Sequence, residues 1–346
     1  MNRKIQIVNV DCFFGGPEGY AQEIASLECF GVEWILSNTQ SEEEIINAAR
    51  EADILLVEHP KTPITRRVIE KLSNCFLIGK YAIGVDNIDV AAATELGIIV
   101  CNAADFCVEE VSDHTVALIL ACLRRIVFLD RHVHKGASWG GVRLEYPIRR
   151  ARTQILGLIG FGRIARLVAR KTKGFGLKIL ASDPYVSDEA MTELDVEPVS
   201  TERLLQESDF VSIHTPLTQE TKNLIGVKEL KSMKPDAFLI NTARGALVDE
   251  EALIQALQEG WITGAALDVT REEPLPSESA LRRLENVILT PHYGANSADS
   301  VADLHRTMAE SIAAVLQGCW PPFPVNPKVN PRIPLKPYDG SVLKLQ

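Results

Sequence analysis

The chain has 346 residues, of which 46% are hydrophobic and 24% are charged, and its formal net charge at pH 7 is −10. This length exceeds the roughly 100–200 residues of a typical domain and predicts two globular domains. The acidic balance argues against nucleic-acid and anionic-membrane surfaces, and the longest apolar run, residues 116–123, is too short to cross a bilayer. We therefore expect a small-molecule partner, with no nucleic acid and no membrane.

The seven cysteines are odd in number and show no C-x-x-C spacing. This usage predicts reduced thiols in a cytoplasmic protein and no metal site. The apolar run at the N-terminus is too short for a signal peptide.

Residues 4–102 alternate short β-rich runs with helical segments. The expected strands are 5–10, 32–36, 54–57, 76–79 and 98–101. Ser41 and Glu44 form a capping box for a helix over 42–50. Such alternation indicates a parallel sheet with helices on both faces.

One long helix is expected over 108–130, and a polar segment, 131–153, leads to the motif GLIGFGRIARLVARKTKGFGLKILASD at 157–183. Here a strand meets Gly160 and Gly162, a helix follows, and a second strand ends on Asp183. Gly160 suits a tight turn and Gly162 suits close approach of a pyrophosphate, while the first helical amides face the phosphates. Asp183 would accept hydrogen bonds from the ribose hydroxyls. The order strand, turn, helix, strand, acid predicts a dinucleotide site.

The charge of Asp183 also argues for NAD over NADP. A 2′-phosphate close to this carboxylate would be repelled by about 1 kcal/mol at ~4 Å in water and by about 4 kcal/mol at an effective dielectric near 20. Neither of the two residues that follow Asp183 supplies a cation to offset the repulsion.

Further strands are expected at 210–214, 238–241, 264–267 and 287–289, and a last helix at 298–316. The fold class is therefore α/β, with two doubly wound parallel-sheet domains. Seven of the eighteen prolines lie between Pro321 and Pro337, so this tail either wraps over a neighbouring surface or, as we expect, is disordered.

Ligands of a doubly wound sheet gather outside the carboxyl ends of its strands. His214 follows one strand, and a local bond to the backbone is favoured for it over catalysis. Arg244 follows the next; it could pair with Asp249 or Glu250, or bind a substrate carboxylate through its planar fork. Asp268, Glu273 and His292 follow the last two strands. Charged groups on successive strand ends favour a catalytic site.

The motifs GVDNID (84–89), GLIGFGRIA (157–165), HTPLTQET (214–221), NTARGALVD (241–249), GAALDVTREEP (264–274) and TPH (290–292) occur in the order typical of one family. The chain resembles the D-isomer-specific 2-hydroxyacid dehydrogenases, leaning toward the branch of the C-terminal binding proteins. This resemblance covers nearly the whole chain apart from the tail. It implies a Rossmann NAD domain inserted into a flavodoxin-like substrate domain, with the active site in the cleft between them.

The resemblance also assigns site residues. Arg244, Glu273 and His292 fall on the catalytic positions, with His292 as general acid and base, Glu273 orienting it and Arg244 holding the substrate carboxylate. Lys61, Ile83, Gly84 and Arg244 are expected to bind substrate. The residues expected to line NAD are Gly160, Gly162, Arg163, Ile164, Asp183, His214, Thr215, Pro216, Thr221, Thr242, Ala243, Asp268 and His292.

The expected domains are 1–103 with 295–320 for substrate, 104–294 for NAD, and a tail over 321–346. The arginine-rich segment 124–152 resembles the family's dimerisation arm and implies a homodimer. Two alternatives stay open: an NAD(H)-dependent interaction module of the co-repressor type, and the same chemistry on a hydroxyphosphonate or phosphorylated hydroxy acid. His59 and Lys61 motivate the second, because phosphoglycerate dehydrogenases commonly carry basic residues there. The tryptophan that C-terminal binding proteins place three residues after the histidine is absent after His292.

Overall fold

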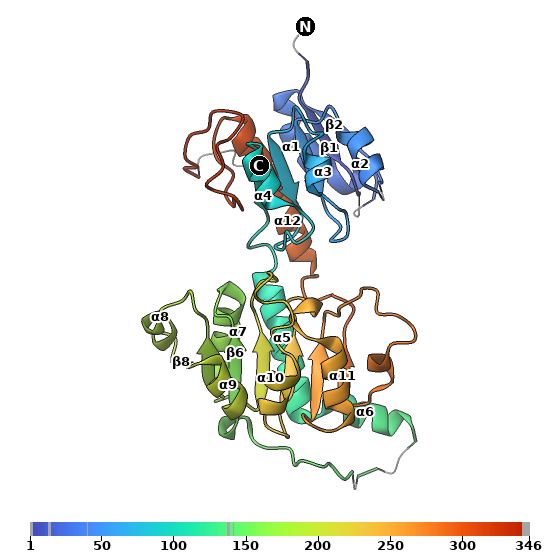
Figure 1. Cartoon of the computed structure of the whole chain (residues 1–346), viewed down its shortest axis with the longest axis vertical. Coiled ribbons are helices and arrows are strands. Elements are labelled where there is room, and N and C mark those ends of the chain that lie inside the picture. Colours follow the sequence, from blue (N-terminus) through green and yellow to red (C-terminus); the bar gives the residue numbers. More distant parts are fainter. Residues whose placement is uncertain (1–2, 13–14, 40, 137–138, 141, 341–346) are drawn as a thin grey trace. The chain divides into compact units, whose positions relative to one another are not determined.

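A computed structural model of the chain describes residues 3–12, 15–39, 41–136, 139–140 and 142–340. Its contacts divide the chain into two units, Met1–Phe106 with Ser297–Gln346, and Cys107–Asn296. In Figure 1 the first unit combines blue-to-teal segments with the red C-terminal part, so distant stretches of sequence build one unit.

The first unit contains a five-stranded parallel sheet in the order β2-β1-β3-β4-β5. Its strands are β1 Gln6–Asn9, β2 Glu33–Leu36, β3 Ile54–Val57, β4 Leu77–Lys80 and β5 Ile99–Asn102. This order is that of flavodoxin, as expected, and all five strands lie within one residue or so of the predicted runs.

Helices cover both faces of this sheet. They are η1 Pro17–Tyr20, α1 Ala21–Leu27, η2 Glu28–Phe30, α2 Glu42–Ala49, α3 Arg66–Ile69, α4 Val90–Glu95 and α12 Ala298–Leu316. The predicted capping box of Ser41 and Glu44 starts α2. One apolar core lies under α2, α3 and α4, and the other lies under α1 and α12. At Gly79 in β4 a Cβ would lie 2.7 Å from Met308 Sδ, so glycine lets α12 pack directly on the sheet.

The expectation of a disordered tail is wrong for residues 318–340, which the structure places on the first unit. Asn326 accepts a hydrogen bond from Val100 N (2.8 Å) and donates to Ile98 O (2.9 Å). Arg332 donates to the carbonyl oxygens of Leu72, Ser73, Cys75 and Leu96. These side-chain bonds, together with the backbone bond from Val325 N to Val100 O (2.7 Å), hold the proline-rich segment at the edge of the sheet. Residues 341–346 lie outside the described part.

The second unit contains a seven-stranded parallel sheet in the order β12-β11-β10-β9-β6-β7-β8. Its strands are β6 Ile155–Ile159, β7 Lys178–Ser182, β8 Glu197–Pro198, β9 Phe210–Ile213, β10 Phe238–Asn241, β11 Gly264–Leu267 and β12 Val287–Leu289. Counted from β6, the first six strands follow the Rossmann order 3-2-1-4-5-6, with the switch point between β6 and β9. The predicted Rossmann fold is confirmed.

The helices of this unit are α5 Val108–Arg124, α6 Ile126–His134, η3 Ala151–Thr153, α7 Arg163–Lys173, α8 Asp188–Thr192, α9 Thr201–Glu207, α10 Val227–Ser232, η4 Gly245–Leu247, α11 Glu250–Gln258 and η5 Ala280–Arg283. One core joins α5 and α7 to the sheet, and the opposite core joins α9, α10 and α11. The single helix predicted over 108–130 is wrong, because Arg125 has φ 56° and breaks it into α5 and α6.

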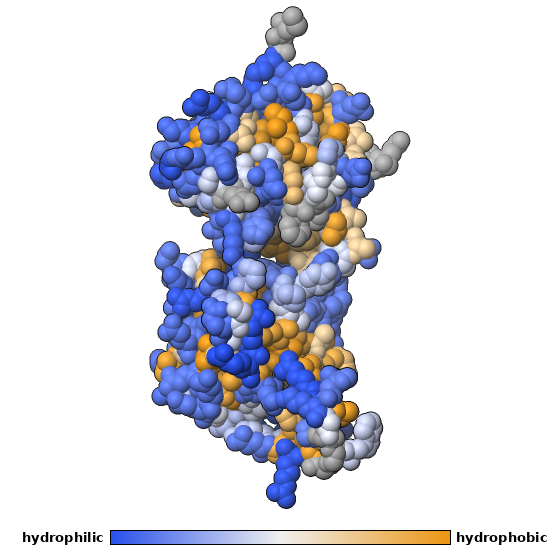
Figure 2. Space-filling model, turned by 90° about the vertical axis from the view of Figure 1, so that its right-hand side faces the viewer, coloured by the Kyte–Doolittle hydropathy of each residue, from blue (hydrophilic) through white to orange (hydrophobic). Residues whose placement is uncertain are grey.

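The surface carries polar and apolar areas side by side, as Figure 2 shows for one face. Exposed large apolar residues include Ile126, Val133 and Trp139, which are 55%, 46% and 91% exposed. Of the helices in the described residues, none combines the length and apolar character needed to cross a bilayer.

Candidate active site

The glycine turn after β6 has the geometry that a pyrophosphate needs. Gly160 has φ 86°, and a Cβ there would lie 2.8 Å from the carbonyl carbon and oxygen of His214, so only glycine fits this turn. A Cβ at Gly162 would meet no atom within 4 Å, so the backbone borders open space. Gly162 is the N-cap of α7 and supplies no side-chain acceptor to the first turn of this helix, the position where a Rossmann fold binds the pyrophosphate.

Asp183 lies directly after β7, beside this turn. Its Oδ2 accepts a hydrogen bond from Phe161 N (2.7 Å) and its Oδ1 accepts one from Tyr185 N (2.8 Å). A cavity of about 490 Å³ opens beside it, lined by residues that include Pro184, Met191 and Thr201. The Asp183 carboxylate, the start of α7 without a side-chain cap, and the open turn at Gly162 together form a site that fits a dinucleotide.

The loop after β9 faces the glycine turn through its backbone. His214 Nε2 lies 2.9 Å from Ser212 Oγ, a side-chain partner and not the expected backbone one, and removal of the ring from water lowers its pKa to about 4. Thr215 N would lie 3.0 Å from a Cβ on Gly160, so it borders the turn. Thr221 Oγ1 donates to Pro216 O (2.7 Å) and holds the loop closed.

Arg244 lies in a tight turn after β10. Asn241 holds this turn, because its Nδ2 donates to Arg244 O (2.8 Å) and its Oδ1 accepts from Ala243 N (3.0 Å). The Arg244 side chain donates from Nη1 to Ala243 O (2.7 Å). The next residue, Gly245, packs so closely on Thr270 that a Cβ would lie 2.0 Å from its carbonyl group. Arg244 is therefore held against the loop that carries Glu273.

His292 follows β12 with a left-handed backbone, φ 54°, and its N donates to Asp268 O (2.7 Å). Its Nδ1 lies 2.7 Å from Glu273 Oε2, and Glu273 Oε1 accepts from Thr270 N (3.1 Å). Burial alone would raise the pKa of Glu273, but the hydrogen bond and charge of His292, with Thr270 N and Arg244, lower it. An ionised Glu273 fixes Nδ1 of His292 as a donor and leaves Nε2 for a reacting group.

Asp268 is 3% exposed. It accepts from Thr290 Oγ1 (2.5 Å), Tyr293 N (2.9 Å) and Gly294 N (2.9 Å), and His114 Nε2 lies 3.3 Å away. Burial would raise the pKa of Asp268, but these contacts hold it well below its usual range. Asp268 thereby fixes the backbone of His292 and of the two residues that follow it.

The remaining expected residues lie in the first unit. Lys61 is exposed in the loop after β3, where its N donates to His59 Nδ1 (3.1 Å). Ile83 and Gly84 follow β4, and Asn102 Nδ2 donates to Ile83 O (2.6 Å).

Two residues of α5 that the sequence did not single out also reach the strand ends. His114 Nε2 lies 3.0 Å from Thr290 Oγ1, and Thr115 Oγ1 lies 2.8 Å from Thr242 Oγ1. The polar character of these two residues was the only signal in the sequence, and it does not identify the groups that they contact.

A Rossmann sheet with this glycine turn, Asp183 and a His292–Glu273 pair defines an oxidoreductase that uses NAD. Residues 116–294 match the family described as D-isomer specific 2-hydroxyacid dehydrogenase, NAD binding domain. The chain belongs to the D-isomer specific 2-hydroxyacid dehydrogenase family, and its activity is that of an NAD-dependent 2-hydroxyacid dehydrogenase.

Three relatives illustrate the similarity. A glyoxylate reductase of Korarchaeum cryptofilum is 42% identical over 293 residues, which are 84% of this chain and 87% of that protein. A D-3-phosphoglycerate dehydrogenase of Methanocaldococcus jannaschii is 41% identical over 305 residues, 86% of this chain and 57% of the relative. The crystal structure of a D-lactate dehydrogenase from Aquifex aeolicus, complexed with NAD and lactic acid, matches with TM-score 0.80 and 28% identity over 90% of this chain and 96% of that one.

Proposed function

We propose that the chain interconverts a small D-2-hydroxy acid and its 2-keto acid, with His292 as general acid and base, Glu273 orienting it and Arg244 binding the substrate carboxylate. The 2.7 Å contact between His292 Nδ1 and Glu273 Oε2 carries this proposal, since it leaves Nε2 as the proton-transfer atom. When bound, NADH would supply the hydride to C2 in reduction, and NAD⁺ would accept it from C2 in oxidation.

In the reduction direction, the His292 imidazolium gives its Nε2 proton to the carbonyl oxygen as C2 becomes the hydroxyl carbon. The negative charge of Glu273 stabilises the imidazolium before this transfer. In oxidation, neutral His292 takes the hydroxyl proton. The same two side chains therefore serve both directions.

Arg244 presents a planar guanidinium that can bind a carboxylate through two parallel hydrogen bonds. The backbone amides of the loop after β4, at Ile83 and Gly84, are proposed as further carboxylate donors. In the NAD-binding unit, Thr242, Ala243 and Asp268 are proposed to line the nicotinamide ring.

Two of the relatives are named for small acids, glyoxylate and lactate. We therefore take glyoxylate and short 2-keto acids as the first substrates to test. NADH absorbance reports their reduction directly.

Arg244→Ala tests the assignment. We expect kcat/KM to fall at least about 10²-fold while NADH binding, followed by its fluorescence, is retained. Arg283→Ala is the matched control, because Arg283 is exposed and lies in η5. Unchanged turnover in Arg244→Ala would refute the role of this arginine.

A second substrate class is favoured by a cavity of about 450 Å³ in the first unit. His59 and Lys61 line it with Asp11, Cys12, Asn38, Thr39 and Thr62. Two basic side chains fit an anionic group beyond the carboxylate, such as a phosphate or phosphonate. If this alternative holds, Lys61→Met raises the KM for 3-phosphoglycerate or a hydroxyphosphonate and leaves the KM for glyoxylate unchanged. An equal change in KM for the two kinds of substrate would exclude a second anionic group at this cavity.

We also propose a homodimer formed through α6 and the segment that follows it. Within the described residues α6 has no buried side chain, and Ile126, Val133 and Trp139 expose large apolar groups. Light scattering on the double variant Ile126→Ser with Val133→Ser tests this, with loss of the dimer expected and an unchanged mass contradicting it.

Cysteine usage favours the cytoplasm. Cys75, Cys101, Cys107 and Cys122 are buried free thiols. Burial raises the pKa of each of them to about 12, so they are unreactive core residues that a reducing compartment keeps as thiols.

A further inference from the structure

Helix α5 reaches the carboxyl ends of β11 and β12 through the side chain of His114. Its Nε2 lies 3.0 Å from Thr290 Oγ1 and 3.3 Å from Asp268 Oδ1. The ring also borders Gly294, where a Cβ would lie 3.3 Å from Cδ2 of His114. The imidazole is therefore placed between these strand ends and the turn that follows His292.

The hydrogen bonds around Thr290 determine which group donates to which. Burial would raise the pKa of Asp268, but its contacts, that with His114 foremost, hold it well below its usual range, so this group is a carboxylate that only accepts. The one proton of the Thr290 hydroxyl must then point to Asp268 Oδ1 (2.5 Å), which leaves Thr290 Oγ1 as an acceptor toward His114. Nε2 of His114 therefore carries a proton and donates, and the same N–H faces the negative charge of Asp268.

Asp268 passes this constraint to the turn of His292. Its carbonyl oxygen accepts from His292 N (2.7 Å), and its carboxylate accepts from the amides of Tyr293 and Gly294 (both 2.9 Å). The backbone of His292 has φ 54°, a conformation that a residue other than glycine keeps only where its surroundings impose it. The N–H of His114 is thus one of the groups that impose it.

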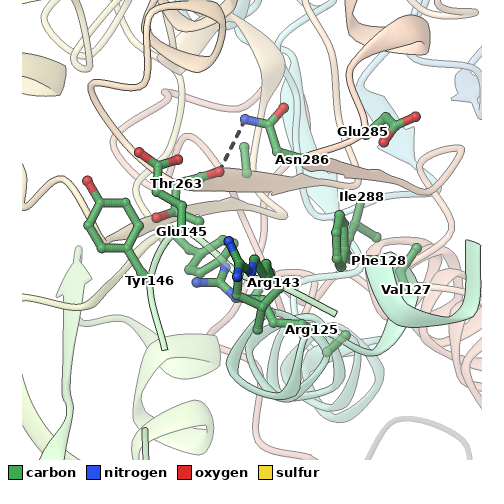
Figure 3. Close-up of a pocket in the computed structure, with 15 residues that line it drawn as sticks. Arg125, Val127, Phe128, Arg143, Glu145, Tyr146, Thr263, Glu285, Asn286 and Ile288 are labelled. Carbon is green, nitrogen blue, oxygen red and sulfur yellow. Dashed lines mark hydrogen bonds between the residues drawn. The ribbon is translucent and has the colours of Figure 1, made fainter. Parts of the chain in front are cut away.

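Helix α5 is held to the sheet at both ends, which fixes the place of His114. Near its start, Thr115 Oγ1 lies 2.8 Å from Thr242 Oγ1 at the end of β10. At its other end, the guanidinium carbon of Arg125 lies 4.1 Å from the ring centre of Phe238, at the beginning of β10. Figure 3 shows Arg125 among the residues that line a cavity of about 160 Å³ at this end. A helix attached at both edges of the sheet positions a side chain more accurately than a loop does.

We propose that His114 is a positioning residue for the acid–base step: the N–H at its Nε2 holds Thr290 and Asp268, and through them the turn that carries His292. This role rests on the proposed function, in which His292 transfers the proton. It requires a donor at the place of Nε2, and it does not require that His114 titrate, since its partners are Thr290 and Asp268 and not the substrate.

Two amide substitutions separate this donor from the packing of the ring. Glutamine can place its NH₂ group near the position of Nε2, whereas the shorter asparagine reaches only the position of Nδ1. We expect His114→Asn to lower kcat at least about tenfold while the KM for the 2-keto acid changes by less than about threefold, because Arg244 still binds the carboxylate. His114→Gln should keep at least about half of the wild-type kcat, since it restores the donor.

The pH profile of kcat distinguishes a positioning residue from a second titrating group. His114→Gln should keep both limbs of the wild-type profile, because His292 and Glu273 form the proposed acid–base pair. Asp113→Asn is the control, since it places asparagine at the neighbouring position of α5, where the side chain is 70% exposed, and it should keep the wild-type kcat. Equal kcat values in His114→Asn and His114→Gln, or a limb missing from the profile of His114→Gln, would overturn the proposal.

Nuclear magnetic resonance of the full chain with ¹⁵N-labelled histidine tests the same inference without NAD and without turnover. The ring signals of His114, assigned by their absence in His114→Gln, should show a proton on Nε2 at neutral pH. The ring signals of His292 should keep their wild-type positions in His114→Gln and move in His114→Asn. An Nε2 of His114 without a proton, or His292 signals that do not move in His114→Asn, would overturn the proposal. A chain that shows the expected signals but reduces no 2-keto acid would refute the proposed function and support the placement of His292 by His114.

Discussion

Nδ1 of His292 lies 2.7 Å from Oε2 of Glu273, a residue 19 positions earlier in the chain. The contact forms because Thr270 N holds the other oxygen of Glu273, and because Asp268 binds the backbone amides of the histidine and of the two residues after it. The acid–base pair is therefore set by the loops after β11 and β12 rather than by the two side chains alone.

Replacing Glu273 by Gln should lower kcat by about 10²-fold. Glutamine can still accept the hydrogen bond from Nδ1, but it lacks the charge that stabilises the imidazolium. Steady-state kinetics with NADH would measure the change. Glu272→Gln is the control, since Glu272 is exposed, and the prediction fails if both variants lose the same activity.

Replacing Gly245 by Ala should damage both stability and activity. The new methyl group would overlap the carbonyl of Thr270, so the loop of Arg244 must move away from that of Glu273. We expect a loss of about 1–3 kcal/mol in the free energy of unfolding and a lower kcat/KM. Gly174→Ala, whose methyl group would meet only Lys171 O at 3.9 Å, should be nearly neutral. Normal thermal stability of Gly245→Ala would count against this packing.

Replacing Asp183 by Asn should narrow the preference for NADH over NADPH. Asparagine keeps an acceptor oxygen for Phe161 N or Tyr185 N but removes the charge that repels a 2′-phosphate. A repulsion of about 1–4 kcal/mol predicts that the Kd for NADPH divided by the Kd for NADH falls by roughly five-fold to several hundred-fold. Fluorescence titration with both cofactors measures this ratio, and an unchanged ratio would assign the preference to other residues.

His214 should make stability depend on pH. Its pKa is about 4 in the folded state and about 6.5 when unfolded, so between these values the unfolded chain binds a proton that the folded chain does not. The contribution of neutral, buried His214 to the free energy of unfolding is complete above pH 6.5 and is lost progressively as the pH falls toward about 4. Urea titrations of His214→Gln should show a flatter pH dependence in this range.

His134→Gln is the control for that experiment, because the His134 side chain is 80% exposed. An unchanged slope in His214→Gln would show that His214 does not carry the effect. Since His214 also lies outside the proposed acid–base pair, its variant should keep most of the turnover that His292→Gln loses.

The strand ends of both sheets were predictable because each buried parallel strand is a short apolar run followed by polar or turn residues, as at Asn241 and Asp268. The family motifs then placed Arg244, Glu273 and His292 on those ends. The break at Arg125 was not predictable, because neither glycine nor proline marks it and apolar residues continue on both sides. His114 was missed because its contact with Thr290 depends on how α5 packs, which periodicity does not report.

The bonds of Asn326 and Arg332 have a consequence for the order of folding. These residues, together with α12, complete the unit that contains β1 to β5, yet they are synthesised after all of residues 107–296. During translation, domains fold as their residues become available. The unit that begins first is therefore finished last. In an incomplete chain the NAD-binding sheet is complete, whereas the sheet of β1 to β5 still lacks α12 on one face and the C-terminal segment at its edge.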